Sequence, residues 1–249
     1  MISLRLLVWA LAGLVLVTLM CVFRLVQVLH STHTLPRPRR HRPPIDEAVL
    51  AVFLGSGGHT AEMLRLVAHL DFENKFKRRV WMVQNGDRMS GEKALAMEKR
   101  IGGGEFRILR IPRARRVHQS YLTSPFTTLH TLFFCLWHIT LAPFFSNPPR
   151  GGKRQSADVI LLNGPGSCVP IACSAFLPRI LALPSPSLIY IESLARTRRL
   201  SLSGRLVRPL VDRFFVQWDS LRDALVEREG IRGRGWSLRA EVECQGWLV

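Results

Sequence analysis

From residue 48 onward, short apolar runs alternate along the chain with stretches that carry apolar residues at helical spacing. Apolar runs bounded by glycine, proline and polar residues are typical of buried parallel strands. The predicted strands are Ala48–Leu54, Val80–Val83, Phe106–Ile111, Asp158–Leu162, Leu188–Ile191 and Phe214–Gln217, with Ala240–Cys244 as a candidate last strand. The predicted helices are Ala61–Leu70, Ser90–Arg100, Val169–Leu177, Leu202–Val211 and Ser220–Glu229. This order predicts an α/β fold with a Rossmann-like, doubly wound parallel sheet.

The amino-terminal region has a different pattern. Leu6–Phe23 is an uninterrupted apolar run whose only polar residue is Thr18. A helix of this length nearly spans the hydrocarbon core of a bilayer. The run is longer than the apolar region of a signal peptide and ends without a small-x-small cleavage site, so the sequence favours one transmembrane helix. Five arginines between residues 24 and 42 follow the run, which predicts a cytosolic body and a lumenal amino terminus.

These patterns divide the chain into three regions. We expect a membrane anchor over residues 1–27, a basic spacer rich in proline and arginine over residues 28–46, and the α/β domain with a carboxyl-terminal tail over residues 47–249. The basic residues of the spacer would lie over anionic lipid headgroups, where each contributes about 1 kcal/mol.

The segment Leu122–Phe145 is rich in leucine and phenylalanine but also contains several threonines, two histidines and Pro143. These residues are costly in a bilayer. A second membrane span here would also separate the later strands from Ala48–Leu54. We therefore expect a long helix packed on the sheet, and the sequence leaves open whether one face of it touches the membrane.

Composition and charge exclude some classes of protein. The chain has 249 residues, 47% of them hydrophobic and 21% charged, which excludes a disordered chain. The net charge of +17 fits either nucleic acid or an anionic membrane as a partner. Basic stretches with interleaved aromatic residues are missing, so we expect no nucleic-acid binding. The five cysteines lack zinc-ligand spacing and there is no Asp-x-Asp pair, so we expect no bound metal.

A glycine-rich loop follows the first predicted strand. It consists of Gly55, Ser56, Gly57, Gly58, His59 and Thr60. Glycines let the backbone approach a ligand closely, and free N–H groups at the start of the next helix attract an anion. The loop lacks the glycine spacing of a dinucleotide motif and the lysine of a P-loop. It predicts a phosphate or sugar site, with a tight structural turn as the alternative; His59 is a candidate general base or a hydrogen-bonded structural residue.

Polar residues at other strand ends would meet this loop, because the carboxyl ends of parallel strands lie at one edge of the sheet. Asn163, Gly164 and Gly166 follow the fourth predicted strand, and Glu192 follows the fifth. The Glu192 carboxylate would bind sugar hydroxyls or, alternatively, cap a helix or form a salt bridge. A basic turn with Arg113 and Arg116 would clamp pyrophosphate or meet lipid headgroups, and a solvated turn is the alternative.

Several motifs occur in a fixed order along the chain. They are Gly55–Thr60, Ile111–Arg113, Phe126–His130, Asn163–Gly166 with Cys168–Pro170, Tyr190–Ser193, Leu202–Gly204 and Phe215–Trp218. Together they resemble the Alg-fourteen family, the membrane-anchoring subunits of the two-subunit UDP-GlcNAc transferase of asparagine-linked glycosylation. The resemblance covers roughly residues 48–218, while Gly230–Arg239 and Ser146–Gln155 depart from the family pattern.

The resemblance implies one half of a GT-B glycosyltransferase. In that family this chain corresponds to the acceptor-side domain, and a cytosolic partner of the Alg-thirteen family binds the donor UDP-GlcNAc, so no cofactor is expected here and the chain alone would be inactive. The complex would add the second GlcNAc, β1,4-linked, to dolichyl-pyrophosphate-GlcNAc. It would act on the cytosolic face of the endoplasmic reticulum membrane, which is continuous with the nuclear envelope. The first-mannose transferase of the same pathway is a further candidate partner.

The resemblance also implies roles for single residues. The loop Gly55–Thr60 would hold the acceptor's pyrophosphate or first sugar, and His59 would be the base of an inverting transfer that needs no metal. Arg113 and Arg116 would meet the lipid phosphate. The residues expected to complete the cleft are Asn163, Gly164, Gly166 and Glu192. The residues expected to contact the partner are Gly246, Trp247, Leu248 and Val249 at the apolar carboxyl terminus.

Two rival interpretations stay open. One is a self-sufficient membrane-bound glycosyltransferase, which would turn over UDP-GlcNAc without a partner. The other is a non-enzymatic membrane adaptor that only tethers a partner, and such a protein would keep its function after bulky substitutions of Gly57 or Gly58. A small-molecule oxidoreductase is disfavoured because the dinucleotide motif is imperfect.

Overall fold

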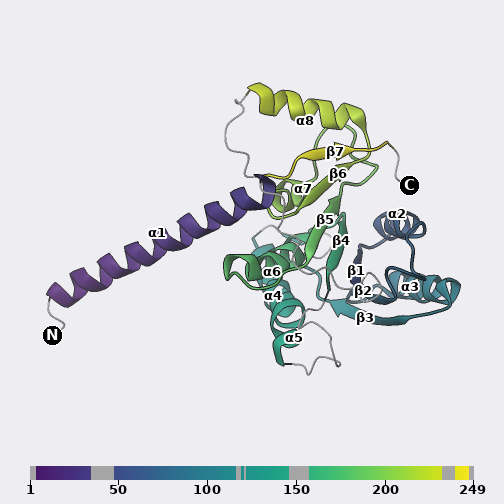
Figure 1. The fold of residues 1–249 in the computed structure, drawn as a ribbon, viewed down its shortest axis with the longest axis horizontal. Coiled ribbons are helices and arrows are strands. Elements are labelled where there is room, and N and C mark those ends of the chain that lie inside the picture. Colours follow the sequence, from purple (N-terminus) through teal and green to yellow (C-terminus); the bar gives the residue numbers. More distant parts are fainter. Residues whose placement is uncertain are drawn as a thin grey trace.

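The protein is described from a computed structural model that covers residues 4–34, 48–115, 119–120, 122–145, 157–231 and 239–246. Its centre is a seven-stranded sheet in the order β3-β2-β1-β4-β5-β6-β7 (Figure 1). The strands are β1 (Val49–Leu54), β2 (Arg78–Gln84), β3 (Glu105–Ile111), β4 (Val159–Asn163), β5 (Ser187–Ile191), β6 (Arg213–Val216) and β7 (Val242–Cys244). The helices are α1 (Leu4–Thr34), α2 (Gly58–Val67), α3 (Arg88–Ile101), α4 (Ser124–Cys135), the π-helix η2 (Leu136–Leu141), α5 (Ala142–Phe145), α6 (Cys168–Ile180), α7 (Leu202–Val207) and α8 (Asp219–Ile231).

All neighbouring strands of the sheet are parallel, and the chain order reverses between β1 and β4. This is the predicted doubly wound arrangement, and each predicted strand is present with ends shifted by at most two residues. One predicted helix was too long: α7 ends at Val207 rather than at Val211. Pro209 explains the early end: Arg208 still has helical geometry, but proline has no N–H to continue the hydrogen-bond pattern of the helix.

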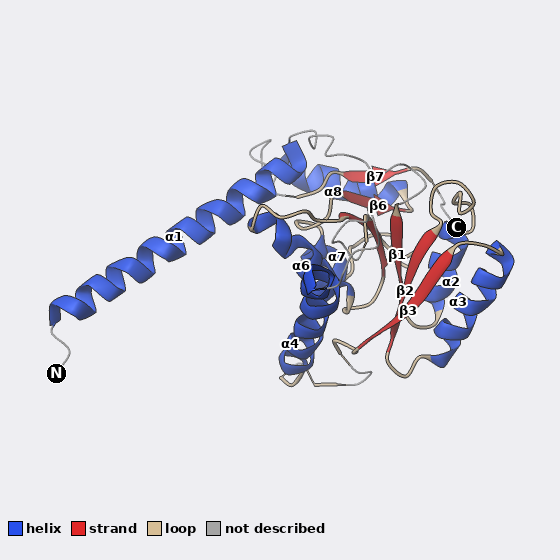
Figure 2. Cartoon of the chain, turned by 60° about the horizontal axis from the view of Figure 1, so that its bottom comes forward, coloured by secondary structure: helices blue, strands red, loops and turns tan. Residues whose placement is uncertain are grey.

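Helices cover both faces of the sheet, so the central strands are apolar on both sides. Alternate residues of β1 show this division: Leu50, Val52 and Leu54 pack with α2 and α3, whereas Ala51 and Phe53 belong to the core beneath η2 and α6. Figure 2 shows α2 and α3 on one side of the sheet and α4 and α6 on the other. The domain therefore has two cores that share one sheet.

Helix α1 is both the candidate membrane span and part of the domain. Its stretch Leu6–Thr32 is long and apolar enough to cross a membrane, and the residues before Arg24 are exposed. Further along, Val28 is buried in the core, and Arg24 Nε donates to the carbonyl oxygen of Ile180 at 3.1 Å. Residues 28–34 are thus helical, and the anchor helix continues past the predicted boundary at residue 27 into the predicted spacer. Residues 35–46 of that spacer lie outside the described residues.

The expected long helix at Leu122–Phe145 is present as α4, η2 and α5 in succession. Its threonines face the domain. Thr127 Oγ1 donates to the carbonyl oxygen of Ala114 at 2.6 Å, and Thr140 Oγ1 donates to that of Ser174 at 2.6 Å. These threonines thereby satisfy loop and helix carbonyls on the packed face of this segment, whereas Thr123 and His130 are exposed.

A buried ion pair joins α3 to the sheet. Arg79 on β2 and Glu98 on α3 are 2% and 7% exposed, and two parallel N–H···O bonds of 2.8 and 2.7 Å link guanidinium and carboxylate. The indole N–H of Trp81 also donates to Glu98. Because both charges are out of water, each depends on the other for its solvation.

We expect Glu98→Gln to lower the free energy of unfolding by about 3–5 kcal/mol, because it leaves the buried Arg79 cation without its counter-charge. Glu92→Gln, at an exposed position on the same helix, is the matched control and should have little effect. Thermal unfolding of the purified chain in detergent, followed by circular dichroism, measures both. Equal stability of the two variants would contradict the importance of the pair.

Candidate functional site

Three loops meet at the carboxyl edge of the sheet, where the strand order reverses. They follow β1 (residues 55–57), β4 (residues 164–167) and β5 (residues 192–201). Ligands of open α/β sheets bind at such switch points. The sequence prediction that these loops lie together is confirmed by contacts between their residues.

The loop after β1 leads into the amino terminus of α2. Gly57 is the N-cap residue, has φ +65°, and provides no side chain to cap the helix. Ser56, Gly57 and Gly58 are exposed. The first N–H groups of an α-helix have no partner within the helix, and the helix dipole favours negative charge at this end. The geometry therefore suits an anion such as phosphate, as the sequence predicts.

A network centred on Glu62 of α2, which was not predicted, joins this helix to the end of β4 and to the loop after β5. The Glu62 carboxylate accepts hydrogen bonds from Asn163 Nδ2 at 3.1 Å, from the Ser193 hydroxyl at 3.0 Å and from the Leu194 N–H at 3.0 Å. His59 lies one turn earlier on α2, with Nδ1 3.7 Å from the same carboxylate. The sequence signal for this pair is the position of Glu62 three residues after His59, which places both side chains on one face of a helix.

The network orients the His59 ring. Asn163 gives its amide N–H to Glu62, so its Oδ1 is left to accept the Nδ1–H of His59 at 2.9 Å. The proton is then on Nδ1, and Nε2 keeps its lone pair, with no hydrogen-bond partner among the described residues. The His59 side chain is 33% exposed, so a ligand can reach it. This is the tautomer that a general base needs.

The same carboxylate sets the electrostatics of the histidine. Glu62 raises the pKa of His59 above its usual 6.5, with a smaller contribution from Asn163, while partial burial acts in the opposite direction. Burial raises the pKa of Glu62, but its hydrogen bonds from His59, Asn163, Ser193 and Leu194 outweigh it and leave that pKa lowered. Glu62 is therefore an anion beside His59, and it stabilises the imidazolium that forms when His59 takes up a proton.

Two of the predicted glycines are required by close packing. A Cβ at Gly164, which has φ +91°, would lie on the His59 ring, and a Cβ at Gly55 would lie on the ring of Pro165. A Cβ at Gly166 or Gly58 would meet nothing within 4 Å. The loops therefore need Gly55 and Gly164 to bring His59 against β4, whereas the space at Gly166 tolerates a side chain.

Two predicted ligand contacts need correction. Glu192 is 1% exposed, and its carboxylate accepts the N–H groups of Ser193 and Ser201 and the hydroxyl of Ser201. Ser201 is the N-cap of α7, so the structure favours the helix-capping alternative over contact with a sugar. Thr60 is buried too, and its hydroxyl bonds to the Gly55 carbonyl and the Ser90 hydroxyl, so it shapes the loop.

The loop after β3 also reaches this edge. The buried Ser167 hydroxyl accepts hydrogen bonds from Gln84 Nε2 and from the Ala114 N–H, both at 3.1 Å, which ties the loops after β2, β3 and β4 together. The neighbouring Arg113 has a buried Nε without a partner in the described part of the chain.

Of the predicted carboxyl-terminal contact residues, Gly246 is described and has φ +80°. The remaining predicted residues lie outside the described residues: Arg116, Trp247, Leu248 and Val249.

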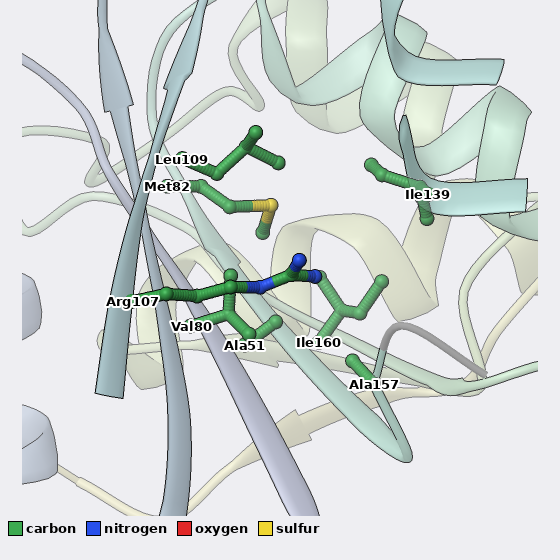
Figure 3. Close-up of a pocket in the computed structure, with 8 residues that line it drawn as sticks. All are labelled: Ala51, Val80, Met82, Arg107, Leu109, Ile139, Ala157 and Ile160. Atoms are coloured by element: carbon green, nitrogen blue, oxygen red, sulfur yellow. The ribbon is translucent and has the colours of Figure 1, made fainter. Parts of the chain in front are cut away.

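A small apolar hollow lies away from these loops, between the sheet and η2 (Figure 3). Its single charged lining residue, Arg107, extends across it between Met82 and Ile160. Burial, with some repulsion from Arg78, lowers the pKa of Arg107. No group of three or more metal-ligating side chains occurs within the described ranges. The carboxyl edge is therefore the better candidate site.

Fold and site together define a Rossmann-like α/β domain with an uncapped helix terminus suited to an anion, an oriented histidine and a candidate amino-terminal membrane span. The family model "Oligosaccharide biosynthesis protein Alg14 like" matches residues 50–233. The chain belongs to this family, which confirms the resemblance read from the sequence.

Curated relatives named "UDP-N-acetylglucosamine transferase subunit ALG14" match most of the chain. The Candida albicans protein is 41% identical over 82% of this chain and 85% of its own length. The human protein is 35% identical over 86% and 91%, and the mouse protein 35% over 90% and 94%. Among solved structures, LpCGTa in complex with UDP has a TM-score of 0.46 at 13% identity, with 81% of this chain matched to 53% of that one.

We expect Gly164→Ala to destabilise the protein by about 1–3 kcal/mol, since the alanine must hold a backbone conformation that suits glycine and displace the His59 ring. Gly166→Ala is the matched control, because its Cβ enters open space in the same loop. Thermal unfolding in detergent compares the two. Comparable stability of the two variants would mean that His59 is not held against Gly164.

Proposed function

We propose that this chain is the acceptor-binding subunit of a UDP-GlcNAc transferase that adds the second GlcNAc, β1,4-linked, to dolichyl-pyrophosphate-GlcNAc. The observation that carries the proposal is the pairing of an uncapped α2 amino terminus with an oriented, accessible His59 on the same helical turn. Membership of the Alg14-like family and the names of its curated relatives support it.

The amino terminus of α2 is the proposed site for the acceptor's pyrophosphate. Free N–H groups in its first turn would bind the phosphate oxygens, and the exposed Gly57 and Gly58 allow close approach. The proposed roles of Arg113 and Arg116 are to add positive charge toward the lipid phosphate. The acceptor's sugar is bonded directly to the pyrophosphate, so anchoring the one brings the other to the neighbouring His59.

His59 is the proposed general base of an inverting displacement. Its Nε2 would take the proton from the acceptor's 4-hydroxyl as that oxygen attacks C1 of the donor sugar, and the bond from C1 to UDP breaks with UDP leaving. Glu62 stabilises the imidazolium that results, and Asn163 keeps the ring in place. In these steps the chain's own residues would accept and stabilise the proton, and we assign no metal to them.

The donor UDP-GlcNAc is proposed to bind mainly to a cytosolic partner of the Alg-thirteen family, which makes this chain inactive alone and one half of a GT-B enzyme. The partner would close over the carboxyl edge, and the apolar carboxyl terminus from Gly246 to Val249 is the proposed contact. The first-mannose transferase of the pathway is a further proposed partner. We place the complex at the endoplasmic reticulum membrane, with the amino terminus lumenal and the domain cytosolic, and α1 supports the anchoring.

The test of the base is His59→Ala in the chain co-expressed with its partner. We expect a fall in transfer of about 100-fold or more, the usual contribution of a general base, with unchanged recovery of the partner. The pH profile of kcat/KM adds a second readout. Activity should fall as the pH decreases through the pKa of His59, which lies above 6.5, and Glu62→Gln should move this acid limb to lower pH because it removes the main cause of the raised pKa.

Glu73→Gln, at an exposed position outside the site, is the control for the removal of an acid. Unchanged transfer by His59→Ala would sink the base assignment and favour the adaptor interpretation. Transfer by the purified chain without a partner would favour the self-sufficient enzyme.

The proposed partner contact is tested by deleting the last four residues, Gly246–Val249. An apolar Trp-Leu-Val ending is a typical anchor of a protein interface, so we expect co-purification of the tagged partner to fall by at least tenfold. The deleted chain should keep the thermal stability of the full chain. Retained co-purification would remove the interface assignment and leave the catalytic assignment untouched.

A further inference from the structure

The segment formed by α4, η2 and α5 exposes an apolar face. Its members are large side chains three or four residues apart: Leu122, Phe126, Leu129, Phe133, Trp137, Leu141 and Phe145. Phe126, Phe133 and Trp137 are 76%, 61% and 52% exposed. This spacing places them along one side of the helical segment, opposite the side that packs on the domain through Thr131 and Cys135.

The surface of this segment differs from that of the other outer helices. Residues 122–145 include no aspartate, glutamate, lysine or arginine. Helix α3, on the other face of the sheet, exposes Glu92, Lys93, Lys99 and Arg100. Contiguous apolar surface of this kind on a protein normally marks an interaction site, whereas single exposed apolar residues do not. The aromatic composition of the face suits the region between lipid headgroups and acyl chains.

The anchor brings this face close to the bilayer. Helix α1 continues without a break from its exposed apolar part into the core, and Arg24 contacts the end of α6 only one turn before the buried Val28. No flexible linker separates the span from the domain at this point. Leu181, next to that contact, is exposed as well. The domain must therefore rest close to the membrane surface.

The anchor and the apolar face are also on the same side of the sheet. Val28 of α1, Cys135 of α4 and Ile139 of η2 all belong to one core, whereas α2 and α3 pack on the opposite core. Figures 1 and 2 both show α4 on the side of the domain from which α1 projects. The apolar face is thus on the side of the domain from which the candidate membrane span projects.

We propose that the apolar face of α4, η2 and α5 lies against the bilayer that α1 spans, so that the domain has two membrane contacts. The occupant is the lipid bilayer itself. Two attachments would fix the tilt of the domain relative to the bilayer, which a single spanning helix leaves variable because the helix itself can tilt. The proposal stands on exposure and placement and does not depend on the proposed transferase activity.

Photo-crosslinking of the full chain in lipid nanodiscs containing radiolabelled phospholipid tests this contact. The photoreactive residue p-benzoylphenylalanine replaces Phe133 on the apolar face, Leu16 in α1 as the positive control, or the exposed Leu95 on α3 as the negative control. We expect a lipid adduct at Phe133 at least fivefold above that at Leu95 and of the order of that at Leu16.

The other occupants are distinguishable outcomes of the same experiment. Adduct yields at Phe133 no higher than at Leu95, while Leu16 still labels, would overturn the proposal and leave the anchor intact. A dominant adduct with a second copy of the chain would overturn it in favour of self-association. In isolated membranes that hold the partner, a dominant protein adduct at Phe133 would assign the face to that protein.

Discussion

The candidate site depends on the hydrogen bonds that the Glu62 carboxylate accepts. It joins α2 to the loops after β4 and β5 through Asn163, Ser193 and Leu194. These loops come from segments about 100 and 130 residues later in the chain. Hydrogen bonds to a charged acceptor are stronger than those to a neutral one, and the charge is costly to leave unpaired. The hydrogen bonds of Glu62 therefore hold α2 and the two loops in one relative position. The orientation of His59 follows from that arrangement.

The glycines around this network allow neighbouring side chains to pack closely against the backbone. Gly164 allows the His59 ring to lie on the β4 loop, and Gly204 leaves room for the Glu192 carboxylate, whose own hydrogen bonds begin α7. Two carboxylates therefore have different roles at one edge of the sheet. Glu62 sets the pKa of the accessible His59, whereas Glu192 stabilises the buried loop structure behind it.

The fold could be read from the sequence because parallel strands buried on both faces appear as continuous apolar runs, as in β1 and β4. The loop contacts were harder. Glu62 looks like an ordinary polar residue of an amphipathic helix, and its partners come from segments distant in the chain. The sequence predicts the correct edge of the sheet for Glu192 and Thr60. The directions of their side chains depend on local hydrogen bonds, which the spacing of residues along the chain does not show. The continuation of α1 to Thr34 was missed for a related reason, since it rests on the contact with α6.

The proposed anion site and the proposed membrane contact together impose a requirement on the proposed lipid-linked acceptor. Its phosphates would have to leave the headgroup region to reach the amino terminus of α2, while its hydrocarbon chain stays in the bilayer. Helix α4 starts beside the loop that carries Arg113, since Thr127 and Thr128 both donate to the Ala114 carbonyl. The apolar face that begins there would, in the proposed orientation, connect the carboxyl edge of the sheet with the membrane, and it has no charged side chain of its own. A fixed tilt is useful for such a substrate, because a domain of variable tilt would hold this edge near the bilayer only part of the time.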